Sequence, residues 1–218
     1  MYKVKGKPWA YSGAIDVSDC ATAKEVMLKA GLNFNVAKCE LVGKMPIKLT
    51  GTDEELDRII KEQKEGAHVF GTDIYRKCDN AFATYRTDYN IPLGVVKSKY
   101  TIVQNNDAFN FFDDAIGKNS AIWQTAGFWG NGERIFVSAK LPNNILVKGD
   151  PVENYLVFTN THDGSGGVKI LFTPIRVICQ NTLNAAIRTS SNYVSFRHTT
   201  SAVSYTHLRA HETRHDLV

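Results

Sequence analysis

Four apolar segments between residues 121 and 177 constrain the fold of this chain more than any other feature. They are rich in aromatic and β-branched residues, are separated by links that each contain glycine, and cover residues 121–129, 133–140, 153–161 and 167–177. Asn131-Gly132 between the first two segments is a favoured two-residue hairpin turn, because both residues tolerate positive φ. The pattern predicts an antiparallel β meander.

Helical patterns flank the meander in the sequence. Before it, Asn105 or Asn106 can cap a helix in which Phe109, Phe112 and Ile116 recur at helical spacing. After it, a closing helix is expected over about 178–188, with its apolar residues toward the core. We therefore predict an α+β domain in which helices pack on one face of the meander.

The first 92 residues are predicted to add two helices and three strands. Capping boxes at 22–25 and 52–55 each open a helix, and residues 32–42 alternate as a strand does. Residues 67–76 and 80–87 are typical of a hairpin with its turn near Cys78-Asp79-Asn80. Asn90-Ile91-Pro92 is expected to break the pattern before the next strand-like residues.

Composition narrows the class of protein. The 43% hydrophobic and 22% charged residues are the proportions of a globular domain, and no apolar run is long enough to cross a bilayer. The four cysteines (Cys20, Cys39, Cys78 and Cys179) are scattered, which favours reduced thiols over a disulfide framework or a zinc ribbon. We expect a cytoplasmic protein without a membrane partner, and no cofactor or metal is predicted.

Basic charge gathers near the end of the meander. The window 168–202 has no acidic residue, and its basic residues are Lys169, Arg176, Arg188 and Arg197. Such a surface attracts a polyanion by releasing counterions, so these four residues are predicted to contact nucleic-acid phosphates. Chance is the alternative, because acid-free windows of this length occur.

Aromatic residues alternate along the meander and are expected to pack into the core on one face. The other face could offer a stacking platform for unpaired bases, as in single-strand-binding sheets, although hydrophobic packing is the default for most of these rings. The residues concerned are Trp123, Phe128, Trp129, Tyr155, Phe158 and Phe172.

A second hypothesis is enzymatic. His162 beside Asp163 could transfer protons, and Cys179 at the start of the closing helix could act as a nucleophile, as in a hydrolase or nuclease. The loop from Thr161 to Gly167 also suits a plain hairpin turn, and cysteine is commonly a small buried residue. No catalytic residue is assigned: enzymatic activity is left open, and a binding protein is favoured.

The segments LGVVKSKYTIVQNNDAFNFFDDAIG, TAGFWGNGERIFVSAKLP and YLVFTNTHDGSGGVKILFTPIRVICQNTLNAAI, followed by FRHT, carry a resemblance to a known family. Together with Pro8-Trp9, residues 23–40 and Tyr85-Arg86-Thr87-Asp88, they resemble the phage/plasmid-like proteins that share domain of unknown function 932. The resemblance implies a protein of a mobile genetic element that acts in a bacterial cytoplasm.

The predicted meander and closing helix are also similar to the β-β-β-α core of Rad52-type single-strand annealing proteins, an analogy of fold alone. We therefore expect binding or annealing of single-stranded DNA or RNA in recombination or replication. A module that recruits or counters a host factor is a further alternative, and a homo-oligomer is left open.

The last residues, 203–218, resemble no part of that family. VSYTHLRAHETRHDLV is similar to the conceptual translation of a transposon-type sequencing adapter, which implies a gene assembled from a mixed sample. We expect 203–218 to be a non-native tail, 1–202 to be a single domain cut short, and a C-terminal part to be missing. On this interpretation, the regularly spaced His207, His211 and His215 form no metal site.

Overall fold

A six-stranded antiparallel sheet, in the order β1-β6-β7-β10-β11-β12, forms the centre of the protein in the computed structural model. The structure describes residues 13–46, 52–64, 68–70, 73–116, 121–142, 144–147, 149–190 and 193–199. The strands are β1 (Ala14–Asp16), β6 (Ile122–Trp129), β7 (Arg134–Lys140), β10 (Tyr155–Thr161), β11 (Val168–Thr173) and β12 (Tyr193–Phe196). The predicted α+β class with an antiparallel meander is confirmed.

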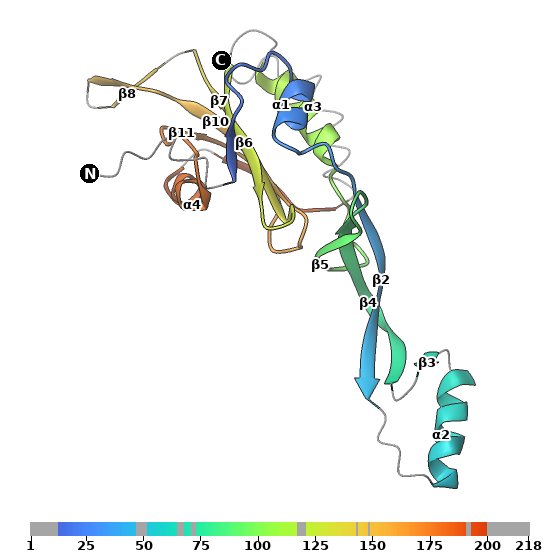
Figure 1. Cartoon of the computed structure of the whole chain (residues 1–218). Helices are drawn as coiled ribbons and strands as arrows, with labels where there is room; N and C mark the ends of the chain where they lie inside the picture. The colour runs from blue at the N-terminus through green and yellow to red at the C-terminus, as the bar shows by residue number, and fades with distance from the viewer. Residues whose placement is uncertain are drawn as a thin grey trace, which may run out of the picture.

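Helices cover both faces of this sheet (Figure 1). On one face, α1 (Ala23–Lys29) and α3 (Asn105–Ile116) pack on a core that includes Ile135 and Val137. On the other face, α4 (Gln180–Thr189) packs on Phe136 and its neighbours. We call the sheet and these three helices the body.

The position of α4 differs from the expected arrangement with all helices on one face. Alternate residues of a strand point to opposite faces, and the meander strands carry apolar residues at both sets of positions. Phe136, Val157 and Leu171 are all buried in the cluster beneath α4. The second face therefore needs a cover of its own.

No helix in the described part of the chain is long and apolar enough to cross a membrane.

A long arm leads away from the body (Figure 1). It is built on the pairing of β2 (Val36–Pro46) with β4 (Asp73–Arg86), and β3 (His68–Phe70) and β5 (Ile91–Lys97) also pair with β4. The helix α2 (Asp53–Lys64) lies at the far end. A small separate hairpin, β8 (Ile145–Val147) and β9 (Asp150–Val152), extends from the body.

Two expectations for the arm were wrong. The predicted turn at Cys78-Asp79-Asn80 lies inside β4, which continues through it because both halves of β4 pair with β2. The pairing register shifts there, and Asn80 adopts a φ of 60°, as in a β-bulge. The predicted break at 90–92 holds the start of β5, where Pro92 is tolerated because β5 pairs with β4 alone among the described strands.

The hairpin between β6 and β7 exists, but its loop is longer than predicted. Trp129 pairs with Arg134, so the loop contains Gly130 to Glu133 instead of Asn131-Gly132 alone. Gly130 and Gly132 adopt the positive φ values, and the backbone N–H of Asn131 donates to the carboxylate of Glu133. The tail 203–218 and its histidines lie outside the described residues.

The arm and the body meet in close backbone contact. A Cβ added to Gly94 of β5 would lie 2.4 Å from the carbonyl oxygen of Asp163, in the turn after β10. Real Cβ atoms do not approach backbone atoms so closely, so only glycine allows β5 to lie against this turn.

Replacing Gly94 by alanine is therefore expected to push the arm away from the body and to destabilise the fold by about 1–3 kcal/mol, as overpacking does. Urea denaturation followed by circular dichroism would measure the loss. Gly43→Ala on β2 is the matched control, because its added Cβ would be 3.5 Å from the Sγ of Cys78, an ordinary contact. Equal stability of the two variants would contradict this account of the join.

Candidate nucleic-acid interface at the sheet edge

Lys169 and Tyr193 share one face at the edge of the main sheet. In the pairing of β11 with β12, Lys169 lies opposite Ser195, and Leu171 lies opposite Tyr193. Leu171 is buried in the cluster beneath α4. Side chains two positions away from it in β11, and the side chain directly opposite it in β12, therefore point to the α4 side. Lys169 and Tyr193 are therefore diagonal neighbours on that side of the sheet.

Arg197 and Arg188 lie toward opposite ends of the edge formed by β11 and β12. Arg197 directly follows β12, and its Cα would lie 3.6 Å from a Cβ added to Gly167, just before β11. Arg188 is exposed in the last turn of α4. The hydroxyl of Ser190, next after that helix, donates to the carbonyl of Phe172 at 2.9 Å and so holds the end of α4 beside β11.

We call Lys169, Arg188, Tyr193 and Arg197 the edge patch. Tyr193 is 57% exposed, which is unusual for an aromatic residue in a strand that completes a sheet. Sequence reasoning missed Tyr193 because the predicted elements stopped at residue 188. The signal was the alternating stretch Tyr193-Val194-Ser195-Phe196, which is too short to predict a strand on its own.

Arg176 was grouped with these residues in the sequence, but it lies near Glu153, just before β10 and away from the edge strand β12. Hydrogen bonds from Lys140 and Tyr155 lower the pKa of Glu153, and the positive charge of Arg176 contributes to that shift. Lys169, by contrast, belongs to β11 and lies opposite Ser195 of the edge strand β12. The acid-free window 168–202 does not show that Arg176 has an acidic neighbour, because Glu153 comes from an earlier part of the chain.

The aromatic stacking platform considered for the meander is not present, because helices cover both faces. Trp123 and Phe158 are buried beneath α1 and α3. Tyr155 is buried on the α4 side, where Trp129 stacks on Phe136 with ring centroids 4.5 Å apart. These rings stabilise the core, and of the aromatic residues on the α4 side Tyr193 is the exposed one among the described residues.

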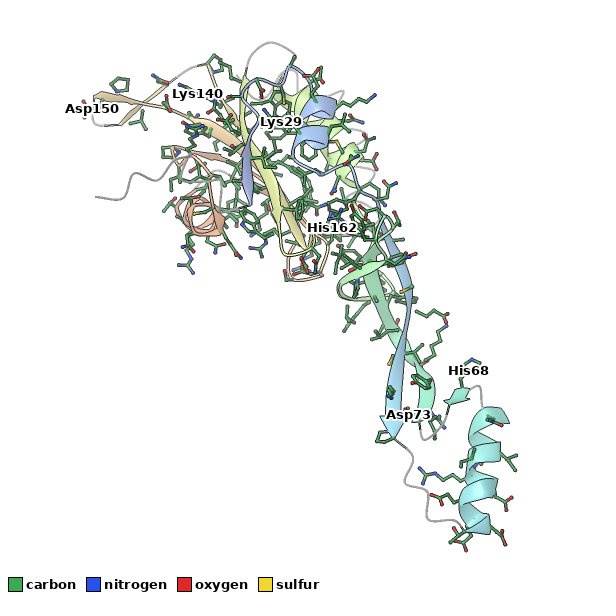
Figure 2. All side chains as sticks on the ribbon, viewed as in Figure 1. Lys29, His68, Asp73, Lys140, Asp150 and His162 are labelled. Atoms are coloured by element: carbon green, nitrogen blue, oxygen red, sulfur yellow. The ribbon has the colours of Figure 1, made fainter. Side chains whose placement is uncertain are left out.

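His162 lies where the arm joins the body (Figure 2). The residue is fully buried, and its Nε2 is 2.8 Å from the side-chain oxygen of Asn105 in α3. Its backbone carbonyl accepts a 2.7 Å hydrogen bond from the hydroxyl of Thr84 in β4. His162 thus connects β10, α3 and β4, which is a structural role.

The proposed His162–Asp163 proton-transfer pair is not formed. Burial lowers the pKa of His162 to about 3, and repulsion by His198 adds to the shift. The carboxylate of Asp163 instead accepts hydrogen bonds from the backbone N–H and the hydroxyl of Ser165, at 2.8 and 2.7 Å. This is the hydrogen bonding of a turn, as the alternative interpretation of the sequence expected.

Cys179 lies on the other side of the sheet from His162. It is the N-cap of α4, where the Thr182 hydroxyl accepts hydrogen bonds from the backbone N–H groups of Ile178 and Cys179. A hydrogen bond with Thr182 lowers the pKa of the Cys179 thiol. The ring of His162 instead contacts Phe34 and Asn105 on the face of α1 and α3. The structure does not bring Cys179 and His162 together as a nucleophile and base.

Side chains that could ligate a metal are also dispersed. In the part of the chain that the structure describes, no three His, Cys, Asp or Glu residues gather into a metal-binding group.

Stability is expected to depend on pH through His162. The folded ring stays neutral down to about pH 3, whereas the ring in the unfolded chain titrates near its ordinary pKa of 6.5. The unfolded state therefore binds more protons between these values, so stability is fully present above pH 6.5 and is lost as the pH falls toward 3. Between pH 7 and pH 5, the loss from this ring should be about 2 kcal/mol.

Urea unfolding at both pH values would measure this loss, and His162→Gln is the matched control because its amide can reach Asn105 but does not titrate. The variant should retain only the smaller loss from other groups such as His198, whose pKa burial also lowers. The same pH dependence in both proteins would contradict the burial of a neutral His162.

Comparison with known proteins places the edge patch inside a region that a family model matches. The model of domain of unknown function 932 matches residues 92–212, more than half of the 218 residues. The match begins within β5 and extends past residue 202, and the adapter origin of 203–218 stays a prediction. No curated protein and no solved structure matches the chain. On the strength of the family match, this chain belongs to the family defined by domain of unknown function 932 (DUF932).

Proposed function

We propose that the protein binds single-stranded DNA or RNA through the edge patch, and that it acts in recombination or replication of a phage or plasmid in a bacterial cytoplasm. One observation carries the proposal: Tyr193 is exposed on the same face of the sheet edge as Lys169, with Arg188 and Arg197 at the same edge. Aromatic rings beside cationic groups are the usual elements of single-strand binding.

The edge patch offers two kinds of contact to a nucleic acid: charges for phosphates and a ring for a base. Lys169, Arg188 and Arg197 supply positive charges for phosphates, and the three come from β11, α4 and the residue after β12. Such contacts provide affinity without reading sequence. Arg188 also lies at the C-terminal end of α4, where a cation is favoured and where no carboxylate occurs in its own helix.

Tyr193 gives the preference for single strands. The bases of a duplex stack on one another, so an isolated ring on a flat sheet edge can stack only on a base that is unpaired. A second aromatic residue is not required at such a site, because successive phosphates can be held by the neighbouring cations. The expected ligand is therefore a short stretch of unpaired nucleic acid, with little dependence on base sequence.

Fluorescence anisotropy with a labelled single strand at several salt concentrations tests the proposal. Arg188→Ala and Arg197→Ala should each weaken binding and lower the salt slope by about 0.7 for each phosphate that is no longer neutralised. Tyr193→Ala should weaken binding by about 1–3 kcal/mol and leave the slope unchanged, whereas Tyr193→Phe should bind normally.

Arg176→Ala is the matched control, because it removes the same charge at a place beyond the edge patch, near Glu153. If no binding occurs at low salt, or if Arg176→Ala weakens it as much as Arg188→Ala, then the edge patch is not the nucleic-acid site. A duplex of the same sequence should compete more weakly than the single strand.

A further inference from the structure

The outer edge of β2 is unpaired beyond Val36, whose backbone N–H and C=O bond the side chain of Gln104. In the arm, β4 lies between β2 on one side and β3 and β5 on the other, and no described strand pairs with the second edge of β2. This strand has 11 residues, which is long for an exposed edge. Beyond Val36, the outward N–H and C=O groups of β2 are not paired with any described strand and form a ready template for another strand.

The distal half of the arm has little core of its own. Among the described residues of 42–46 and 73–80, Ile74 alone is buried. Val42 and Met45 are 48% and 41% exposed. Among the described strands, β3 adds only three residues to β2 and β4 here, so this half of the arm buries little apolar surface and would gain from a further strand.

The usual protections of an edge strand are weak here. Lysine often blocks such an edge, but the Nζ of Lys38 is turned inward and donates to the carbonyls of Ser98 and Tyr100, at 3.2 and 2.7 Å. Pro46 is the last residue of β2, so its missing N–H interrupts no ladder. The central part of the edge, around Val42, is therefore open to pairing.

The charges on β2 are complementary to themselves. Glu40, Val42 and Lys44 alternate along the strand and share one face. If a second β2 pairs antiparallel with the two-fold axis at Val42, each Glu40 lies opposite Lys44 of the other copy. Moving the axis to Leu41 places Lys38 opposite Lys44, and moving it to Glu40 or Lys44 places that charge opposite itself. Of the registers with the axis at residues 40 to 44, only the one at Val42 places both Glu40 and Lys44 opposite an opposite charge.

We propose that two copies of this chain pair through the outer edges of β2, antiparallel, with Val42 on the two-fold axis. The two arms then form one continuous sheet. Within each arm, Glu40 already pairs with Lys77 and Lys44 with Asp73. In the dimer, each Glu40 lies between two lysines and each Lys44 between two carboxylates, so the interface extends an existing alternation of charge.

Sedimentation equilibrium of the full chain tests the register by charge reversal. The unaltered protein should dimerise, and Glu40→Lys should raise the dimer dissociation constant about tenfold or more, because it sets two pairs of lysines opposite each other. The double variant Glu40→Lys with Lys44→Glu should restore the dimer.

This restoration would come from pairing between copies alone. In the double variant, the lysine at position 40 lies beside Lys77 and the glutamate at position 44 lies beside Asp73. Both pairs within the arm are therefore repulsive. Circular dichroism of each variant verifies that the arm is folded. A monomer at every concentration of the unaltered protein, or a double variant as weak as Glu40→Lys, would overturn the proposal.

Disulfide trapping gives a second, independent measurement. In a Cys39→Ser background, Val42→Cys should form an intermolecular disulfide on mild oxidation, because directly opposite residues of paired strands bring their Cβ atoms close together. Met45→Cys is the control, since it is similarly exposed but lies away from the two-fold axis. Equal trapping at both positions would refute the register, and neither result depends on nucleic-acid binding.

Discussion

The close approach of β5 to the turn after β10 is the contact on which the rest of the structure depends. Gly94 has no side chain, and the backbone of Asp163 occupies the space that a Cβ would take. This approach brings Thr84 of β4 within 2.7 Å of the His162 carbonyl and leaves the ring of His162 buried against Asn105. The hydrogen bonds satisfy polar groups that would otherwise be costly to bury. The arm is therefore attached by buried contacts and not by a loose linker.

Coverage of both sheet faces determines where a ligand can bind. Since α1 and α3 occupy one face and α4 the other, the aromatic rings of the meander are committed to the core. The side chains of the edge patch remain accessible because they lie where β12 ends the sheet and α4 ends beside it. The aromatic face that the sequence offered for stacking is therefore part of the core, and the edge patch lies outside that core.

Local patterns predicted the elements that depend on neighbours in the sequence. Alternation located β6, β7, β10 and β11, and the capping box at Thr22 located α1, where the Thr22 side chain accepts from the N–H of Glu25. Contacts between distant segments were beyond such reasoning. Asn80 marks a turn locally, yet pairing with β2 draws it into β4 as a bulge. Likewise, Arg176 lacks acidic neighbours in sequence but lies near Glu153 in space.

The length of the arm has a thermodynamic consequence. A strand of 11 residues such as β2 spans about 36 Å, several times the distance over which substitutions usually influence one another. The distal arm and the edge patch share no side-chain contacts that could transmit a change from one to the other among the described residues. Free-energy changes at the two surfaces should accordingly add. Substitutions in the distal arm should therefore leave the stability and the surface of the edge patch unchanged.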